Sequence, residues 1–199
     1  MNTPTSEAPV TITQIPPASI NPIAIWHTEH MYFRRLLDLL NRQLDVFESG
    51  ARPNYELMLD ILTYLREYSD RYHHPREDVA FARLEAHCPQ LGLTLARLRQ
   101  EHRVIATAGE SLTKLLTAIL DDSLMPRSAV ESAAATYLVY YTSHIAREES
   151  DVLTHAARTL TAEDWEAVRA AVPGAADPLF GDSPAKHYRD LRRHISLES

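Results

Sequence analysis

The sequence predicts an all-α protein, an up-down-up-down four-helix bundle with a short extra helix toward its C-terminus. Apolar residues recur at alternating three- and four-residue spacing along four long segments, as they do on the buried face of a helix. The chain contains only five glycines, and several of its twelve prolines stand where one segment ends and the next begins. No alternating strand pattern interrupts these segments. Long helices joined by short turns are typical of an antiparallel bundle.

The first two segments are bounded by residues that end or begin helices. The first runs from about residue 22 to 48 and stops at Ser49-Gly50. The second runs from about 53 to 87, with Pro53 suited to its first turn. Pro75 falls inside this second segment and should kink or locally distort it, because proline lacks the amide hydrogen of a regular α-helix.

The later segments have similar boundaries. A third helix is expected from about 90 to 120, and Pro126 begins a fourth that continues to about 152. Thr161 and the acidic residues after it predict an N-terminal cap on a short fifth helix, which Pro173-Gly174 ends.

The domain organisation follows from these segments. Residues 1–20 are rich in proline, threonine and serine and are expected to be irregular. Residues 21–175 form the predicted bundle domain, and residues 176–199 form a polar tail that either packs on the bundle or meets a partner. With 199 residues and 45% apolar content, the chain is long enough for one substantial core.

Composition argues against several classes of function. The net charge of −7 and the scattered lysines and arginines disfavour a nucleic-acid partner. Cys88 is the only cysteine, which excludes an intrachain disulfide, disfavours a thiolate zinc site and fits a reducing cytoplasm. The N-terminus lacks the pattern of a signal peptide, and no apolar run approaches the roughly 20 residues of a membrane span. A cytoplasmic protein without a membrane partner is expected.

Histidines are frequent, ten in all, and each long segment places one on its apolar face. Glu77 follows His73 by four residues, and Glu148 follows His144 by four, so each pair shares a helix face. Buried polar groups must be paired or bound to metal. Imidazole and carboxylate ligands suit iron, manganese or zinc, and two carboxylates able to bridge indicate a two-metal centre. The candidate ligands are His30, His73, Glu77, His102, His144 and Glu148.

Over roughly residues 24–158 the sequence resembles the hemerythrin-like, or HHE cation-binding, domain family. The motifs that carry the resemblance are Glu29-His30, His73-His74-Pro75-Arg76-Glu77-Asp78, Glu101-His102 and His144-Ile-Ala-Arg-Glu148-Glu149. The resemblance implies an oxo- or hydroxo-bridged pair of irons in the bundle centre, with the four core histidines as terminal ligands and the two glutamates as bridges. Manganese or zinc could use the same ligands. The Glu-x-x-His motif of ferritin-type sites does not occur.

The sequence departs from the oxygen-carrying members of this family at one ligand. Those proteins have a second histidine four residues after the one on the third helix, and here that position is Ala106. His27, His74 or water is expected to take its place. Their fourth-helix carboxylate falls five residues after its histidine, which would select Glu149. Glu148 is preferred, because four-residue spacing keeps it on the same face as the histidine.

The expected function is therefore that of a di-iron protein that binds, senses or reacts with O2, peroxide or NO. A shorter ligand set leaves open metal positions, which favours reactivity or sensing over reversible oxygen transport. The alternatives are a catalase- or peroxidase-like enzyme, an iron storage or delivery protein, and a structural or haem-binding bundle. The expected partner is a small diatomic or peroxide ligand, with a homo-oligomer also possible. Asp70 and Glu101 are either orienting partners of the imidazoles or solvated side chains.

Overall fold

The computed structural model describes residues 22–181 and 185–197, so the predicted irregular lead-in at residues 1–20 lies outside the described residues. Within the described ranges the regular structure is helical and contains no strand, which confirms the all-α class. The elements, where η marks 3₁₀- or π-helical turns, are α1 (Pro22–Glu48), α2 (Tyr55–Tyr64), η1 (Leu65–His73), α3 (His74–His87), η2 (Pro89–Leu91), α4 (Gly92–Leu120), α5 (Arg127–Arg147), η3 (Glu148–Val152), α6 (Leu153–Thr159), α7 (Ala162–Ala171), η4 (Lys186–Tyr188) and α8 (Arg189–Leu197).

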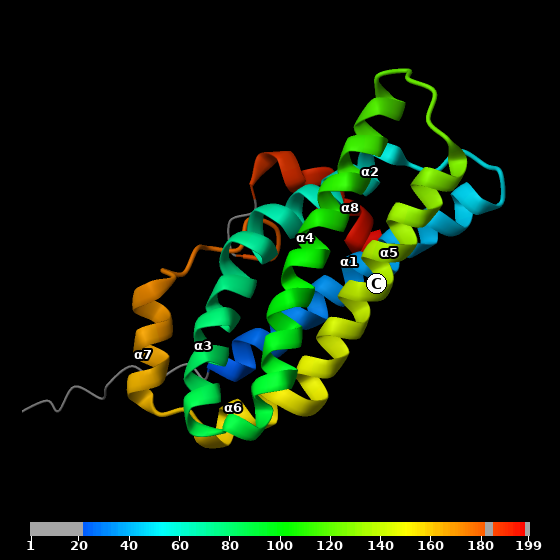
Figure 1. The fold of residues 1–199 in the computed structure, drawn as a ribbon. Helices are drawn as coiled ribbons and strands as arrows, with labels where there is room; N and C mark the ends of the chain where they lie inside the picture. Colours follow the sequence, from blue (N-terminus) through cyan, green and yellow to red (C-terminus); the bar gives the residue numbers. More distant parts are fainter. Residues whose placement is uncertain (1–21, 182–184, 198–199) are drawn as a thin grey trace, which may run out of the picture.

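Four long helical segments lie side by side, and successive segments run in opposite directions (Figure 1). The second is continuous through α2, η1 and α3, and the fourth through α5, η3 and α6. Helix α1 contacts α2 and α5, while α4 contacts the same two helices from the other side. This arrangement is consistent with the predicted four-helix bundle. Helices α7 and α8 lie outside it, packed on α3 and α2 respectively.

The turns use the residues that the sequence singled out. Gly50 has a φ of +83°, the left-handed conformation that ends α1 at low steric cost. Asn54 caps α2 through a side-chain hydrogen bond from the amide of Leu57. Thr161 and Asp164 form a reciprocal capping box at the start of α7, which confirms the predicted cap.

Two stretches of π-helix interrupt the second and fourth segments, where regular α-helix was expected from the sequence. In η1 the π-helical turns end at His73, directly before Pro75 in the first turn of α3. The distortion expected at this proline is therefore a widened helix just before it, where hydrogen bonds span five residues. The second stretch, η3, begins at Glu148. Both π-helical stretches thus fall at candidate ligands.

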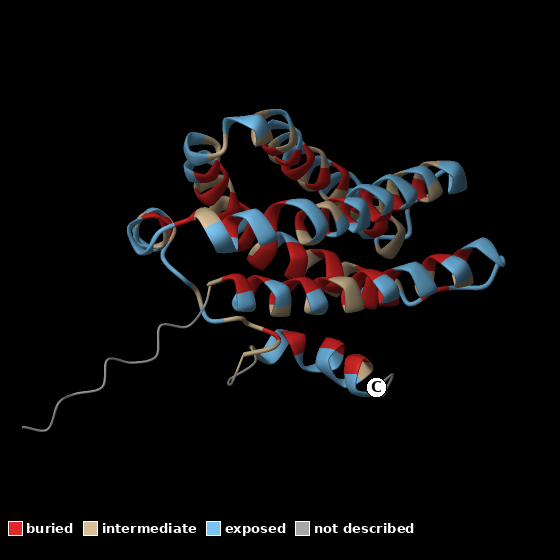
Figure 2. Cartoon of the chain, turned by 90° about the horizontal axis from the view of Figure 1, so that it is seen from below, coloured by how far each residue is buried: buried red, intermediate tan, exposed pale blue. Residues whose placement is uncertain are grey.

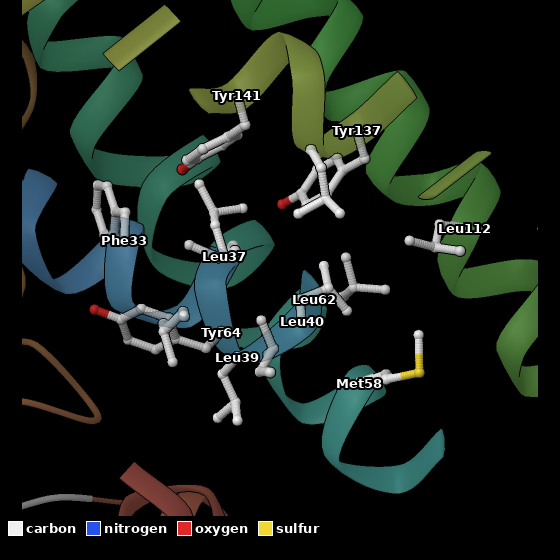
Figure 3. Close-up of a cluster of buried hydrophobic side chains, with 14 of the residues drawn as sticks. Phe33, Leu37, Leu39, Leu40, Met58, Leu62, Tyr64, Leu112, Tyr137 and Tyr141 are labelled. Carbon is white, nitrogen blue, oxygen red and sulfur yellow. The ribbon is translucent and has the colours of Figure 1, made fainter. Parts of the chain in front are cut away.

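The buried side chains form two apolar clusters along the bundle. The larger cluster fills one end and the middle, and Figure 3 shows leucines of α1 and α2 packed beneath Tyr137 and Tyr141 of α5. The smaller cluster fills the other end and includes Trp26, Phe81 and Leu98. Figure 2 shows the buried faces of the long helices turned toward one another. The candidate ligands lie between the two clusters in each segment.

The C-terminal tail contains a helix that was not expected from the sequence. Helix α8 lies along the outside of the bundle with its buried side turned inward (Figure 2). Tyr188, Leu191 and Ile195 are buried against the larger cluster, and the Tyr188 hydroxyl donates a hydrogen bond to Glu67. The tail therefore packs on the bundle, one of the two alternatives expected for it.

No helix among the described residues combines the length and apolarity needed to cross a bilayer.

Substitution of Leu191 tests whether the tail stabilises the bundle. Leu191 is 0% exposed, so Leu191→Ala should lower the free energy of unfolding by about 2–4 kcal/mol through lost burial and a residual cavity. Leu124 is 98% exposed, and Leu124→Ala should change the same quantity by less than about 0.5 kcal/mol. Urea unfolding of both variants measures the difference. Equal stabilities would contradict the packing of α8.

Candidate metal centre

The six ligand candidates converge from all four long segments into the gap between the two apolar clusters. Each stands on its helix between residues of the larger and the smaller cluster, as His30 does between Trp26 and Phe33. The side chains of Glu77 and Glu148 are 0% exposed. The buried candidates are His30, His73, Glu77, His102, His144 and Glu148, and His74 is buried with them.

One group of donors lies between α1, η1 and α3. The Nε2 atoms of His30 and His73 are 2.9 Å apart. Oε1 of Glu77 lies 3.4 Å from the first of these nitrogens and 3.0 Å from the second. Oε2 of Glu148 approaches the His30 nitrogen to 3.4 Å from the opposite helix. His30, His73 and Glu77 are close enough together to share one metal ion.

A second group lies beside the first, between α3, α4 and α5. His74, His102, His144 and Glu77 offer donor atoms that all lie within 4.8 Å of one another. Oε2 of Glu77 lies 3.5 Å from Nε2 of His102. Oε1 of Glu148 lies 3.1 Å from Nε2 of His144 and 3.7 Å from that of His102.

The two glutamates face both groups with different oxygens. Each turns one carboxylate oxygen toward the His30 side and the other toward the His102 side. A carboxylate in this position can bridge two cations. The arrangement therefore resembles two adjoining metal positions that share two bridges.

The atoms that point into this space are buried and lack hydrogen-bond partners. Such atoms are rare in native interiors, because each unpaired group retains its desolvation cost. Here they gather at one point and are imidazole nitrogens and carboxylate oxygens, the donors that divalent and trivalent metals prefer. The residues present therefore fit a metal pair. The atoms are both carboxylate oxygens of Glu77 and of Glu148, Nε2 of His102 and Nε2 of His144.

The π-helical turns explain how neighbouring residues reach different groups. On a regular α-helix, His73 and His74 would point in clearly different directions around the axis. Both are buried here, the first in the His30 group and the second in the other. The His74 ring stacks on that of His102, with centroids 4.2 Å apart and planes 13° apart. His74 of the second segment thus offers the second group an imidazole, which the third segment does not provide at Ala106.

Every buried histidine of the cluster has a carboxylate beside its Nδ1 atom. Metal-bound histidines commonly donate their second ring N–H to a carboxylate, which fixes the ring and raises its basicity. The distance from Nδ1 to the nearest carboxylate oxygen ranges from 2.6 to 3.3 Å among these pairs. Four of the five cross between helical segments, and the His74 pair lies within the second. The pairs are His30 with Glu149, His73 with Glu29, His74 with Asp70, His102 with Asp78, and His144 with Glu101.

Two of these carboxylates are held by arginines. Arg76 donates to both oxygens of Glu29, which also accepts a hydrogen bond of 2.7 Å from the Tyr68 hydroxyl. Glu101 accepts from Arg97 and Arg147. The motifs contained both glutamates. Arg97 stands four residues before Glu101 on the same helix, whereas Arg76 and Arg147 reach their glutamates from other helical segments, which spacing alone does not predict.

His27 and Glu149, two of the alternative ligand candidates, lie outside both groups. Glu149 turns one oxygen to Nδ1 of His30, at 2.7 Å, and the other to Nδ1 of His27, at 2.6 Å. The His27 side chain is 47% exposed. In this geometry Glu149 orients the His30 imidazole, and Glu148 occupies the bridging position between the groups.

When protons are the only cations present, the cluster keeps its two carboxylates ionised and raises the pKa of four of its imidazoles, those of His30, His73, His102 and His144. His74 differs, because burial and the neighbouring His102 lower its pKa to about 4. Burial and the neighbouring Glu77 raise the pKa of Glu148, but His144 and His102 outweigh them and lower it to about 2. Burial lowers the pKa of His30, while the hydrogen bond to Glu149 and the nearby negative charges of Glu77 and Glu148 raise it to about 10. The carboxylates thus require positive charge between them, and a metal ion can supply the charge that protons otherwise provide.

Comparison with known proteins gives one result. The family model described as the Hemerythrin HHE cation binding domain matches residues 21–156, which is more than half of the chain. The match confirms the resemblance that the motifs indicated. No curated protein and no solved structure matches.

The roles of His74 and His27 can be separated by metal content. His74→Ala removes a donor from the second group, so bound metal should fall from about two ions per chain toward one. His27→Ala removes an exposed side chain outside both groups and should keep the wild-type content. Elemental analysis after dialysis against a weak chelator measures both. Equal loss in the two variants would contradict the placement of these histidines.

Proposed function

The chain belongs to the hemerythrin HHE cation-binding domain family, and from this premise we propose that it is a non-haem di-iron protein. Its two irons bind, sense or react with O2, peroxide or NO. His30 and His73 hold one iron, His74, His102 and His144 hold the other, and two glutamates bridge them. The observation that carries the proposal is the convergence of the buried, unpartnered oxygens of Glu77 and Glu148 on two groups of imidazole nitrogens.

The two groups differ in how many donors they offer. The first provides two histidines and the second three, while the same two carboxylates face both. An iron held beside His30 would therefore have fewer protein ligands than one in the other group, which would leave room for a small molecule. When bound, the irons supply the redox chemistry and the Lewis acidity.

The protein's own residues control the surroundings of that position. Phe33 packs edge-on against the His73 ring at 4.9 Å, and Trp26 contacts the same ring from the smaller cluster. These apolar side chains limit water near the open position. Glu29 and Glu149 hold the two imidazoles through their Nδ1 atoms and raise their basicity, which favours the more highly charged oxidation state of the metal.

Reaction with peroxide is the second candidate function. The group beside His30 offers two imidazoles against three in the other group, so a metal held there would leave room for a small molecule to bind and accept electrons. Iron storage draws less support, since the described residues form two adjoining groups of donors rather than a larger mineral-binding surface. Manganese or zinc could occupy the same donors, so the metal must be identified directly.

Aerobically purified protein provides the first test of this proposal. We expect about two irons per chain, as two adjoining donor groups require, with near-ultraviolet bands of a bridged ferric pair. Glu77→Ala and His73→Ala should each lose metal and lower the melting temperature, because the site lies within the core. Leu124→Ala, far from the centre and exposed, is the matched control. Protein that stays colourless after anaerobic ferrous loading and exposure to air contradicts the di-iron proposal.

A further inference from the structure

The two tryptophans of the chain lie in line between the protein surface and the candidate metal centre. Trp26 of α1 is 2% exposed, and its ring centroid lies 6.2 Å from that of His73 in an edge-on arrangement. Trp165 of α7 packs edge-on against Trp26, with centroids 5.4 Å apart, and is half-buried. Aromatic contacts therefore connect a proposed ligand to the surface in two steps.

Helix α7 is fixed where Trp165 can make this contact. The capping box of Thr161 and Asp164 begins the helix, and Nε2 of His87 on α3 lies 3.0 Å from the Asp164 carboxylate. Figure 1 shows α7 beside α3, outside the four long segments. Trp165 packs from there against the smaller apolar cluster that contains Trp26. The contact between Trp165 and Trp26 therefore joins α7 to α1, and the contacts of α7 hold it in place.

Electron transfer slows steeply with distance. Conjugated side chains in contact can carry the electron in several short, fast steps. Indole and phenol are the most easily oxidised aromatic side chains. Tyr68 offers a competing route, because its hydroxyl donates to Glu29, the partner of His73. Its oxidation requires the phenolic proton to move to Glu29, whose oxygens already accept bonds from Arg76 and face His73. The tyrosine route also leads outward, because half-buried Tyr72 packs on Tyr68 with ring centroids 6.2 Å apart. An indole can give up an electron before it loses a proton, and this difference favours the route through the two tryptophans.

We propose that Trp26 and Trp165 form an electron path between the metal pair and an external one-electron donor during peroxide reduction. This inference rests on the proposed function. Reduction of one hydrogen peroxide to two waters consumes two electrons and two protons. Trp26 gives one electron to an oxidising equivalent in the centre and becomes a radical cation, which Trp165 then reduces. A donor of the ascorbate class reduces Trp165 and releases one proton to solvent, so two donor molecules balance one peroxide.

The test uses the full chain loaded with iron and treated with hydrogen peroxide without a donor. Freeze-quench electron paramagnetic resonance should show an indole radical, and peptide mass spectrometry should find oxidised Trp26 and Trp165. Metal-free protein treated in the same way is the control. Met31, which is 59% exposed, reports non-specific oxidation and should be modified equally in both samples. Added ascorbate should suppress tryptophan oxidation.

Two variants distinguish electron transfer through the tryptophans from non-specific oxidation by peroxide. Trp26→Phe keeps an aromatic ring in the core but removes the indole that carries the electron first. Trp165 oxidation should therefore fall to the level of metal-free protein. Trp165→Phe should leave Trp26 oxidised and remove its protection by ascorbate. Unchanged Trp165 oxidation in Trp26→Phe overturns the proposal. So does loss of the protein radical in Tyr68→Phe instead, since that result assigns the route to tyrosine.

The metal content and the peroxide consumption of the wild type distinguish two kinds of failure. Protein that binds no iron overturns the proposed function and this inference together. Protein that binds iron and consumes peroxide while both tryptophans stay intact overturns the electron path alone.

Discussion

Burial of two carboxylates in the middle of the bundle is the constraint on which the rest of the structure depends. Glu77 and Glu148 are fully buried, and their oxygens accept no hydrogen bond. Removing an ion from water costs several kcal/mol even after the protein relaxes, and only opposite charge offsets that cost. The surrounding imidazoles meet this need with protons or with metal ions. The cluster lies at the centre of the core, and its negative charge destabilises the fold unless positive charge compensates it. Folding is therefore coupled to metal binding.

The outer carboxylates extend this charge pattern toward the surface. Four of the imidazoles lie between an inner glutamate and an outer carboxylate, whereas Nε2 of His74 faces the Ser69 hydroxyl at 3.2 Å. Three arginines stand beyond two of the outer carboxylates, namely Arg76, Arg97 and Arg147. Negative and positive groups thus alternate from the centre outward. Glu149 belongs to the outer layer although it is next to the inner Glu148 in sequence, because the two side chains leave the helix in different directions. Helix geometry, more than residue type, decides which carboxylate faces the two donor groups.

Much of this could be predicted from local spacing. The pairs His73 with Glu77 and His144 with Glu148 stand four residues apart, so any helix places them on one face. The helix limits also followed from turn residues, because Gly50 and Thr161 act within a few residues of the chain. Such features need no knowledge of which helices become neighbours.

Other features depend on contacts between distant segments and on departures from ideal helix geometry. The inward position of His74 beside His73 depends on π-helical turns, whereas the prediction assumed regular α-helical spacing. The pairing of Glu149 with His30 joins the fourth and first segments. The segment of η4 and α8 buries Tyr188, Leu191 and Ile195 at helical spacing, but charged neighbours and the short length of the segment weakened that pattern.

A crystal structure of the iron-loaded protein, with anomalous diffraction measured above and below the iron absorption edge, tests the central claim most directly. The account predicts two iron peaks inside the bundle, one beside His30 and His73 and the other beside His74, His102 and His144, with Glu77 and Glu148 between them. A single peak, or iron bound only at surface residues such as His27 and Glu149, would contradict it.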